Sequence, residues 1–350
     1  MKKERILYLE VLRVISSIAV VMIHVIAAVV DRFEVTSLSW DILVVCSSII
    51  RWCIPVFFMI SGSLFLSRNY DNCNIAAHIK KYVIKILVIL IVFGTLYYFF
   101  DLWIWKQSIG IKNILVLPLA IVSGNTGYHL WYLYPLVIIY LLTPVLGLLV
   151  SKVRREYVEY LIILCIVLCF VAGYVNEIIA ALNLFSYKIQ FFFCEQMGYV
   201  GCYIIGFYLS KYDLSEPKKK LLHISSVACL IVLTVLNLSL SLSSGQFTVV
   251  FSSYTGLPTV LIACSLFVLF KQTDENRVAL RAKRMLCYIG SHTFGIYLFH
   301  VFFVSIIFRK IFSGGLWGGA VIVLIVGTIV VFACSYVCSL ICKKLFPKLF

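Results

Sequence analysis

The chain has few charged residues: only 13% of its 350 residues are Asp, Glu, Lys or Arg, whereas 63% are apolar or aromatic. A water-soluble domain of this length could not bury so much apolar surface, so the scarcity of charge excludes the soluble classes. Polar connections long enough to fold as a separate soluble domain are also missing. The apolar runs are continuous over about 20 residues, unlike the alternating segments of a membrane barrel. The sequence therefore predicts an all-α, polytopic membrane protein that forms one integral-membrane domain over residues 1–350.

Cysteine pairs with Cys-x-x-Cys spacing are absent, although the chain has 13 cysteines. That spacing is typical of metal and redox sites, so its absence argues against both. Most of the cysteines lie within apolar runs, as Cys165 and Cys169 do, and a buried thiol commonly behaves as a small hydrophobic group. We therefore expect packing cysteines, no disulfide framework and no metal.

Ten apolar runs are long enough to cross a bilayer as helices. The first run is too long and too charged for a cleaved signal peptide, and no Ala-x-Ala site follows it, so we expect it to be retained. The expected spans cover residues 6–30, 42–66, 82–105, 129–150, 158–180, 191–210, 221–242, 248–270, 286–308 and 316–342.

The positive charges are distributed unevenly along this pattern. The large majority of the 30 Lys and Arg residues fall in the two terminal segments and in every second connection. Since positively charged connections stay in the cytoplasm, both termini should be cytoplasmic. The net charge of +15 then reflects topology and attraction to anionic lipid, and it does not indicate a nucleic-acid partner.

The first span contains ionisable side chains. Arg13 and His24 are eleven residues apart, which is about three helical turns and roughly 16 Å along the axis, so both lie on one helix face with Glu10 and Ser17. Charged groups inside a membrane are costly, and they usually face protein or water and mark a functional site. The alternative for Glu10 and Arg13 is a structural ion pair between residues three apart.

The predicted topology also places polar residues in an outer layer. Arg13 lies near the cytoplasmic end of its span, whereas His24, His129, Glu195 and His300 lie toward the outer side. Histidine suits general-base chemistry near neutral pH, and a carboxylate such as Glu195 can raise its basicity and fix its tautomer. The alternative for His300 is a hydrogen bond between helices.

Two further groups of residues are candidate binding groups. Lys80, Lys81 and Lys85 precede or open the third span, where they would suit the phosphates of an anionic ligand or serve only as topology anchors. Trp131 and Tyr132 follow His129 at the outer interface. Aromatic rings there suit stacking on a sugar face, although an ordinary aromatic belt is the alternative.

Four segments, in the right order and spread over most of the chain, resemble signatures of acyltransferase family 3, the integral-membrane acyltransferases. The fourth-span segment is similar to the branch that includes the enterobacterial common antigen O-acetyltransferase and the intercellular-adhesin succinyltransferase. The segments are Tyr8-Leu-Glu10-Val-Leu-Arg13 through His24, Pro55-Val-Phe-Phe-Met-Ile-Ser61-Gly62, His129-Leu-Trp131-Tyr-Leu with Tyr140-Leu-Leu-Thr143-Pro144, and Ser291-His-Thr-Phe294-Gly295-Ile-Tyr297-Leu-Phe-His300.

This resemblance implies transfer of an acyl group from cytoplasmic acyl-coenzyme A, expected to be acetyl-coenzyme A, to a hydroxyl of a cell-surface glycan or its lipid-linked precursor. It implies a bacterial inner or cytoplasmic membrane. By analogy His24 is the base or acyl relay, with Glu195 as its candidate partner, and Arg13 orients the coenzyme. The other expected donor-binding residues are Glu10, Lys80, Lys81 and Lys85, and the expected acceptor-binding residues are His129, Trp131, Tyr132 and His300.

The sequence departs from the family pattern at the loop before the third span, where lysines replace an Arg-rich motif. It also lacks the Glu that follows the His-Trp motif in another branch of the family. A transporter or glycan exporter is the alternative function, because buried charges among ten spans also suit a solute path. A third possibility is an amino-acid uptake or sensing module, since related membrane modules are fused to amino-acid racemases.

Overall fold

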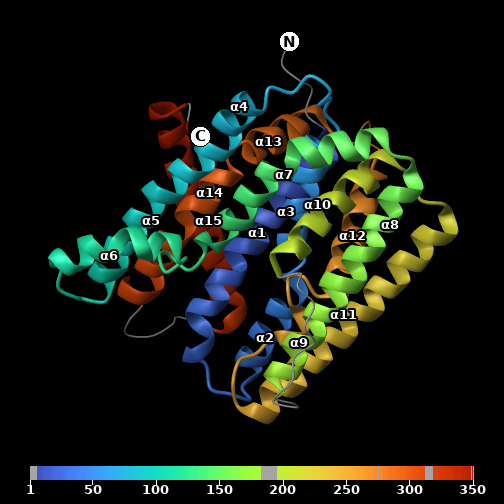
Figure 1. The fold of residues 1–350 in the computed structure, drawn as a ribbon. Coiled ribbons are helices and arrows are strands. Elements are labelled where there is room, and N and C mark those ends of the chain that lie inside the picture. Colours follow the sequence, from blue (N-terminus) through green and yellow to red (C-terminus); the bar gives the residue numbers. More distant parts are fainter. Residues whose placement is uncertain are drawn as a thin grey trace.

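The fold is taken from a computed structural model that describes residues 6–182, 195–274, 276, 278–311, 318–347 and 349, without the side chains of residues 195, 196 and 309–311. Every regular element within these ranges is a helix, which confirms the predicted all-α class. In Figure 1, α1, α3 and α10 run through the middle of the molecule, while α11 lies along one edge and α6 at the opposite edge.

The elements alternate between long helices and short connections. The first half of the chain forms α1 (Leu7–Val29), α2 (Leu38–Ile50), α3 (Cys53–Phe65), α4 (Ile75–His78), a π-helical turn (Ile79–Val83), α5 (Ile84–Ile104), α6 (Ile111–Val122), α7 (Leu133–Lys152), α8 (Arg155–Cys165) and α9 (Ala172–Ala181). The second half forms α10 (Glu195–Lys211), α11 (Glu216–Ser244), α12 (Leu257–Lys271), α13 (Leu280–Gly290), α14 (Thr293–Val304) and α15 (Ala320–Leu345).

Within the described ranges, seven helical segments are long and apolar enough to cross a membrane, and α13 with α14 would be an eighth if the bent pair is one span. The seven are Leu7–Arg32, Leu38–Phe65, Ile75–Ile104, Leu130–Lys152, Arg155–Ala181, Glu216–Ser244 and Ala320–Leu345. The multi-pass membrane class is thereby confirmed. Each of the ten expected spans contains helix, but α10 and α12 have only 17 and 15 residues, so the count of ten stays a prediction.

The expected straight span over residues 286–308 is bent. Its two halves, α13 and α14, meet at an angle of 62° around Ser291 and His292. The physical reason lies in contacts from other helices, because Lys343 of α15 bonds to Ser291 and Glu10 of α1 lies against Gly290.

The outer helices present apolar faces to their surroundings. In α11, Ile224, Val227, Ile231 and Val235 recur at helical spacing and are exposed, whereas the polar Asn237 on another face is fully buried. This arrangement is the reverse of a soluble protein and is what contact with lipid requires.

Helices α3 and α10 pack so closely that glycine is needed at their contact. A Cβ atom added at Gly206 would overlap the backbone of Met59, and one added at Gly62 would overlap the carbonyl of Tyr203. Because these neighbours are backbone atoms, a side chain could enter only if the helices moved apart. This contact joins α10 to the wall of the cavity described below, since Ser61 and Leu64 of α3 line it.

We predict that Gly206→Ala destabilises the folded protein by about 1–3 kcal/mol, the usual cost of overpacking a tight contact. The thermal midpoint of detergent-solubilised protein should therefore fall. Gly173→Ala on α9 is the matched control, because a Cβ atom there would meet nothing within 4 Å. Equal midpoints for the two variants would contradict the close contact between α3 and α10.

The bend between α13 and α14 is held from two sides. The ammonium of Lys343, near the end of α15, donates to the carbonyl and hydroxyl oxygens of Ser291, at 3.2 and 3.1 Å. On the other side Gly290 lies against the carboxylate of Glu10, where any Cβ atom would overlap it. The start of α1 and the end of α15 therefore lie at the same end of the bundle (Figure 1).

Candidate active site

One cavity of about 420 Å³ runs along the polar face of α1. Arg13, Ser17, Val20 and His24 all line it, and they follow one another at spacings of four, three and four residues. The polar stripe that the sequence indicated therefore faces the interior of the bundle. Its other walls come from α3, α5, α7, α14 and the connection before α12.

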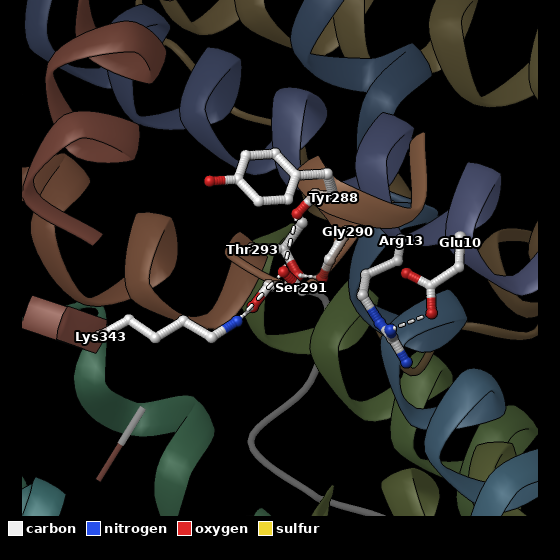
Figure 2. Close-up of polar contacts among 7 residues, drawn as sticks. All are labelled: Glu10, Arg13, Tyr288, Gly290, Ser291, Thr293 and Lys343. Atoms are coloured by element: carbon white, nitrogen blue, oxygen red, sulfur yellow. Dashed lines mark hydrogen bonds and ion pairs between the residues drawn. The ribbon is translucent and has the colours of Figure 1, made fainter. Parts of the chain in front are cut away.

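The end of the cavity near the start of α1 is cationic. The Arg13 guanidinium donates to the Glu10 carboxylate at 2.7 Å, and Glu10 is only 5% exposed. Lys85 and Ser291 line the same cavity, and Figure 2 shows Arg13 and Glu10 facing each other beside the bend that carries Gly290 and Ser291. An anionic group could thus meet Arg13 and Lys85 together.

A second cavity of about 590 Å³ adjoins this end and shares Arg13 with the first. Arg68 and Lys211 add positive charge to it, and Arg68 also donates to the hydroxyl of Tyr82 at 2.7 Å. The Glu10 carboxylate, which pairs with Arg13, also lines it, together with hydroxyl groups of Tyr8, Ser63, Ser67, Ser151 and Ser210. Three cations with several hydroxyls form a surface suited to phosphate groups.

The expected donor-binding residues are therefore only partly brought together. Arg13 and Glu10 form a pair, and Lys85 lines the main cavity, but Lys80 and Lys81 are exposed and line neither cavity. Arg68 and Lys211 were not predicted as binding residues, because both fit the positive-inside pattern. Their positions at the predicted cytoplasmic ends of two spans were the sequence signal that could have identified them.

Three histidine rings gather at the opposite end of the main cavity. The ring centroids of His24 and His300 are 4.9 Å apart, those of His129 and His300 are 5.3 Å apart, and those of His24 and His129 are 6.4 Å apart. They come from α1, α14 and the turn before α7, which are far apart in sequence. All three rings line the cavity.

Tyr297 connects two of these histidines. Its carbonyl accepts a hydrogen bond from Nδ1 of His300 at 2.6 Å, and its hydroxyl donates to the backbone carbonyl of His129 at 3.0 Å. His300 is fully buried. Within the described part of the chain, Nε2 of His300 and both ring nitrogens of His129 have no hydrogen-bond partner. Unpaired buried nitrogens are costly, so a bound molecule that supplied their missing hydrogen bonds would be stabilised here.

Aromatic rings form the wall next to the histidines. Trp131 stacks on Tyr254, with centroids 5.7 Å apart and planes at 19°, and the guanidinium of Arg51 lies over Tyr254 at 4.3 Å. Trp131, Tyr132 and Tyr254 line the cavity, so the two aromatic residues expected at the acceptor side do so. Tyr254 and Arg51 were missed. Arg51 could have been found by the argument used for Arg13, because it is also a cation within a span.

Glu195 begins α10, but its side chain lies outside the described residues. The expected pairing of its carboxylate with His24 therefore stays a prediction. No group of three or more His, Cys, Asp or Glu side chains that could hold a metal ion occurs among the residues that the structure describes.

These features define a multi-pass membrane protein with an interior cavity that is cationic at one end and lined by imidazoles at the other. The profile of the Acyltransferase domain matches residues 6–340, so the chain belongs to acyltransferase family 3. It is also similar to an amino-acid racemase of Enterococcus faecalis, with 36% identity over 95 residues. That match covers 25% of this chain and 13% of the racemase. No solved structure matches the chain.

Proposed function

We propose that the protein transfers an acyl group, expected to be acetyl, from cytoplasmic acyl-coenzyme A to a hydroxyl of a cell-surface glycan or its lipid-linked precursor. The single observation that carries this proposal is that one cavity joins Arg13 to His24, His129 and His300. Both termini then face the cytoplasm of a bacterial cell, and the cationic end of the cavity opens toward the donor. The branch that includes the enterobacterial common antigen O-acetyltransferase is the proposed place within the family.

The dimensions of the cavity support a thioester donor. A volume of about 420 Å³ spread over the roughly 16 Å between Arg13 and His24 suits a narrow chain better than a folded nucleotide. We therefore place the acyl group and its pantetheine arm in the main cavity. The phosphates of the coenzyme lie in the second cavity, against Arg68, Lys211 and Arg13.

The acceptor belongs at the histidine end. Trp131, Tyr132 and Tyr254 line the cavity beside imidazole nitrogens that have no partner among the described residues, a combination that suits a sugar ring with a hydroxyl to be acylated. His24 serves there as base or acyl relay. An exporter would need the same glycan to pass through the protein, and nothing in the racemase similarity adds support to that alternative.

The test offers radiolabelled acetyl-coenzyme A to inside-out membrane vesicles and measures base-labile label in the extracted glycan. We expect labelling that requires His24 and Arg13. In whole cells, the His24→Ala and Arg13→Ala variants should still display the glycan, but without the acyl group. Loss of surface glycan in these variants, with the remaining material still acylated, would favour the exporter.

We predict that Lys211→Gln raises KM for acetyl-coenzyme A by about tenfold, as expected from loss of one hydrogen bond to a charged group. KM for acetyl-pantetheine, which has no phosphates, should not change. Lys219→Gln is the matched control, because Lys219 pairs with Glu216 and lines neither cavity. An equal rise in KM for both donors would contradict the placement of the phosphates.

A further inference from the structure

The hydrogen bond made by His300 fixes which of its ring nitrogens carries a proton. A carbonyl oxygen can only accept, so the 2.6 Å contact with the carbonyl of Tyr297 requires a hydrogen on Nδ1. The neutral ring then has its lone pair on Nε2. This is the role that a carboxylate plays for a catalytic histidine in many enzymes, fulfilled here by a backbone carbonyl.

The ring that carries this lone pair lines the cavity beside the ring of His24. His300 is fully buried, Nε2 has no hydrogen-bond partner among the described residues, and the ring lies 4.9 Å from that of His24. The structural alternative for His300 was a hydrogen bond to another helix. Nδ1 bonds to Tyr297 of the same helix, and Nε2 has no partner among the described residues, so neither nitrogen shows that bond. A buried acceptor without a partner next to a second imidazole is a group positioned to take a proton from a bound hydroxyl.

His129 is less suited to that role. Among the described residues, neither of its ring nitrogens has a partner that would fix a tautomer, and its ring centroid lies 4.4 Å from that of Tyr97. Its backbone carbonyl accepts a hydrogen bond from the hydroxyl of Tyr297. The carbonyl of the same Tyr297 fixes the tautomer of His300. Tyr297 is thus a positioning residue for His300.

We propose that the two imidazoles divide the reaction, so that His24 carries the acyl group and Nε2 of His300 takes the proton of the acceptor hydroxyl. This inference rests on the proposed function, since it needs acyl-coenzyme A as donor. It assigns the base of the second half of the reaction to a residue 276 positions from His24 in the sequence.

The two half-reactions balance. In the first, a ring nitrogen of His24 attacks the thioester carbonyl, the carbon–sulfur bond breaks, and the thiolate takes the proton from the His24 ring to give free coenzyme A and N-acylimidazole. In the second, the acceptor oxygen attacks the acyl carbon while its proton passes to Nε2 of His300. The carbon–nitrogen bond breaks, and the proton on His300 passes to the departing His24 ring, so both rings end neutral.

The experiment separates the two halves. Purified protein is incubated with acetyl-coenzyme A and radiolabelled coenzyme A in the absence of acceptor, and exchange of label into acetyl-coenzyme A reports the first half alone. Vesicles with their endogenous glycan report the complete transfer. For His300→Asn, which keeps a donor for the Tyr297 carbonyl but has no base at Nε2, we expect exchange close to wild type and transfer reduced by about 10²–10⁴-fold.

Controls make each outcome decisive. His223→Gln should keep both activities, because His223 bonds to Ser265 and lines neither cavity. Wild-type protein that transfers the acyl group without any exchange would overturn the acyl-carrying role of His24, and the proposed function would stand. Wild-type protein that shows exchange but labels no glycan would instead refute the proposed acceptor class.

The variant itself can also overturn the role of His300. Transfer by His300→Asn at the wild-type rate would do so. The role of His300 would also be overturned if His300→Asn lost both exchange and transfer while its thermal midpoint equalled that of wild type. Should His300→Asn fold poorly, His300→Gln is judged by the same two rates.

Discussion

Replacing His24 by Gln should abolish acyl transfer, with kcat reduced by at least about 10²–10⁴-fold, the range for loss of a catalytic acid–base group. His24 lies at the end of the polar stripe of α1 and contacts the rings of His300 and Tyr128. Glutamine keeps polarity and approximate size but has no basic nitrogen. Exchange between coenzyme A and acetyl-coenzyme A should be lost with transfer, because the acyl-carrying nitrogen is gone.

The matched control for this variant is His223→Gln on α11. Its ring bonds to Ser265 and stays outside both cavities, so the same chemical change should leave kcat unaltered. Both variants should elute as folded protein with similar thermal midpoints. A His24→Gln protein that kept more than a small fraction of wild-type transfer would show that the imidazole is not needed, and the active-site assignment would then be wrong.

The second large effect is expected at the inner end of the same stripe. Arg13→Gln should raise KM for acetyl-coenzyme A by about 10- to 100-fold, as loss of a hydrogen bond to a charged group typically does. Arg13 is the residue that both cavities share, and its guanidinium is bonded to Glu10 at 2.7 Å. The effect on kcat should be smaller, because Arg13 lies roughly 16 Å from His24.

The paired variant Glu10→Gln with Arg13→Gln separates donor binding from a structural ion pair. If the pair only stabilises the fold, two neutral amides should restore both the thermal midpoint and KM. We expect the midpoint to recover and KM to stay high. Arg155→Gln is the control for removing a guanidinium, because Arg155 pairs with Glu159 and lines neither cavity. Recovery of wild-type KM in the paired variant would leave Arg13 without a role in donor binding.

Local sequence signals predicted the helices and the face of α1 well. Hydropathy alone places α1, α5, α7, α11 and α15, since each must satisfy its backbone hydrogen bonds within itself in a bilayer. Helical periodicity then aligns Arg13, Ser17 and His24, and the cost of polar groups in lipid requires that face to turn inward. Both arguments need only residues that are close in sequence.

The same signals failed where a long helix is interrupted. The bend between α13 and α14 depends on Lys343 of α15 and on Glu10 of α1, which hold Ser291 and Gly290 from other helices. Hydropathy averaged over residues 286–308 cannot register these contacts. The places of Arg68 and Lys211 in the lining of the second cavity were hidden for a similar reason, because the sequence does not distinguish a topology anchor from a cation that lines a cavity.

The sequence by itself determined the membrane class, the polar stripe of α1 and several residues of the cavity, among them His129 and His300. Only the tertiary structure decided that His24, His129 and His300 meet, that Tyr297 fixes the tautomer of His300, and that Arg13 joins two cavities. The physical reason is the range of the interactions. Hydrophobicity and helical period act along one segment, whereas the packing of α1 against α14 and the turn before α7 joins residues more than one hundred positions apart.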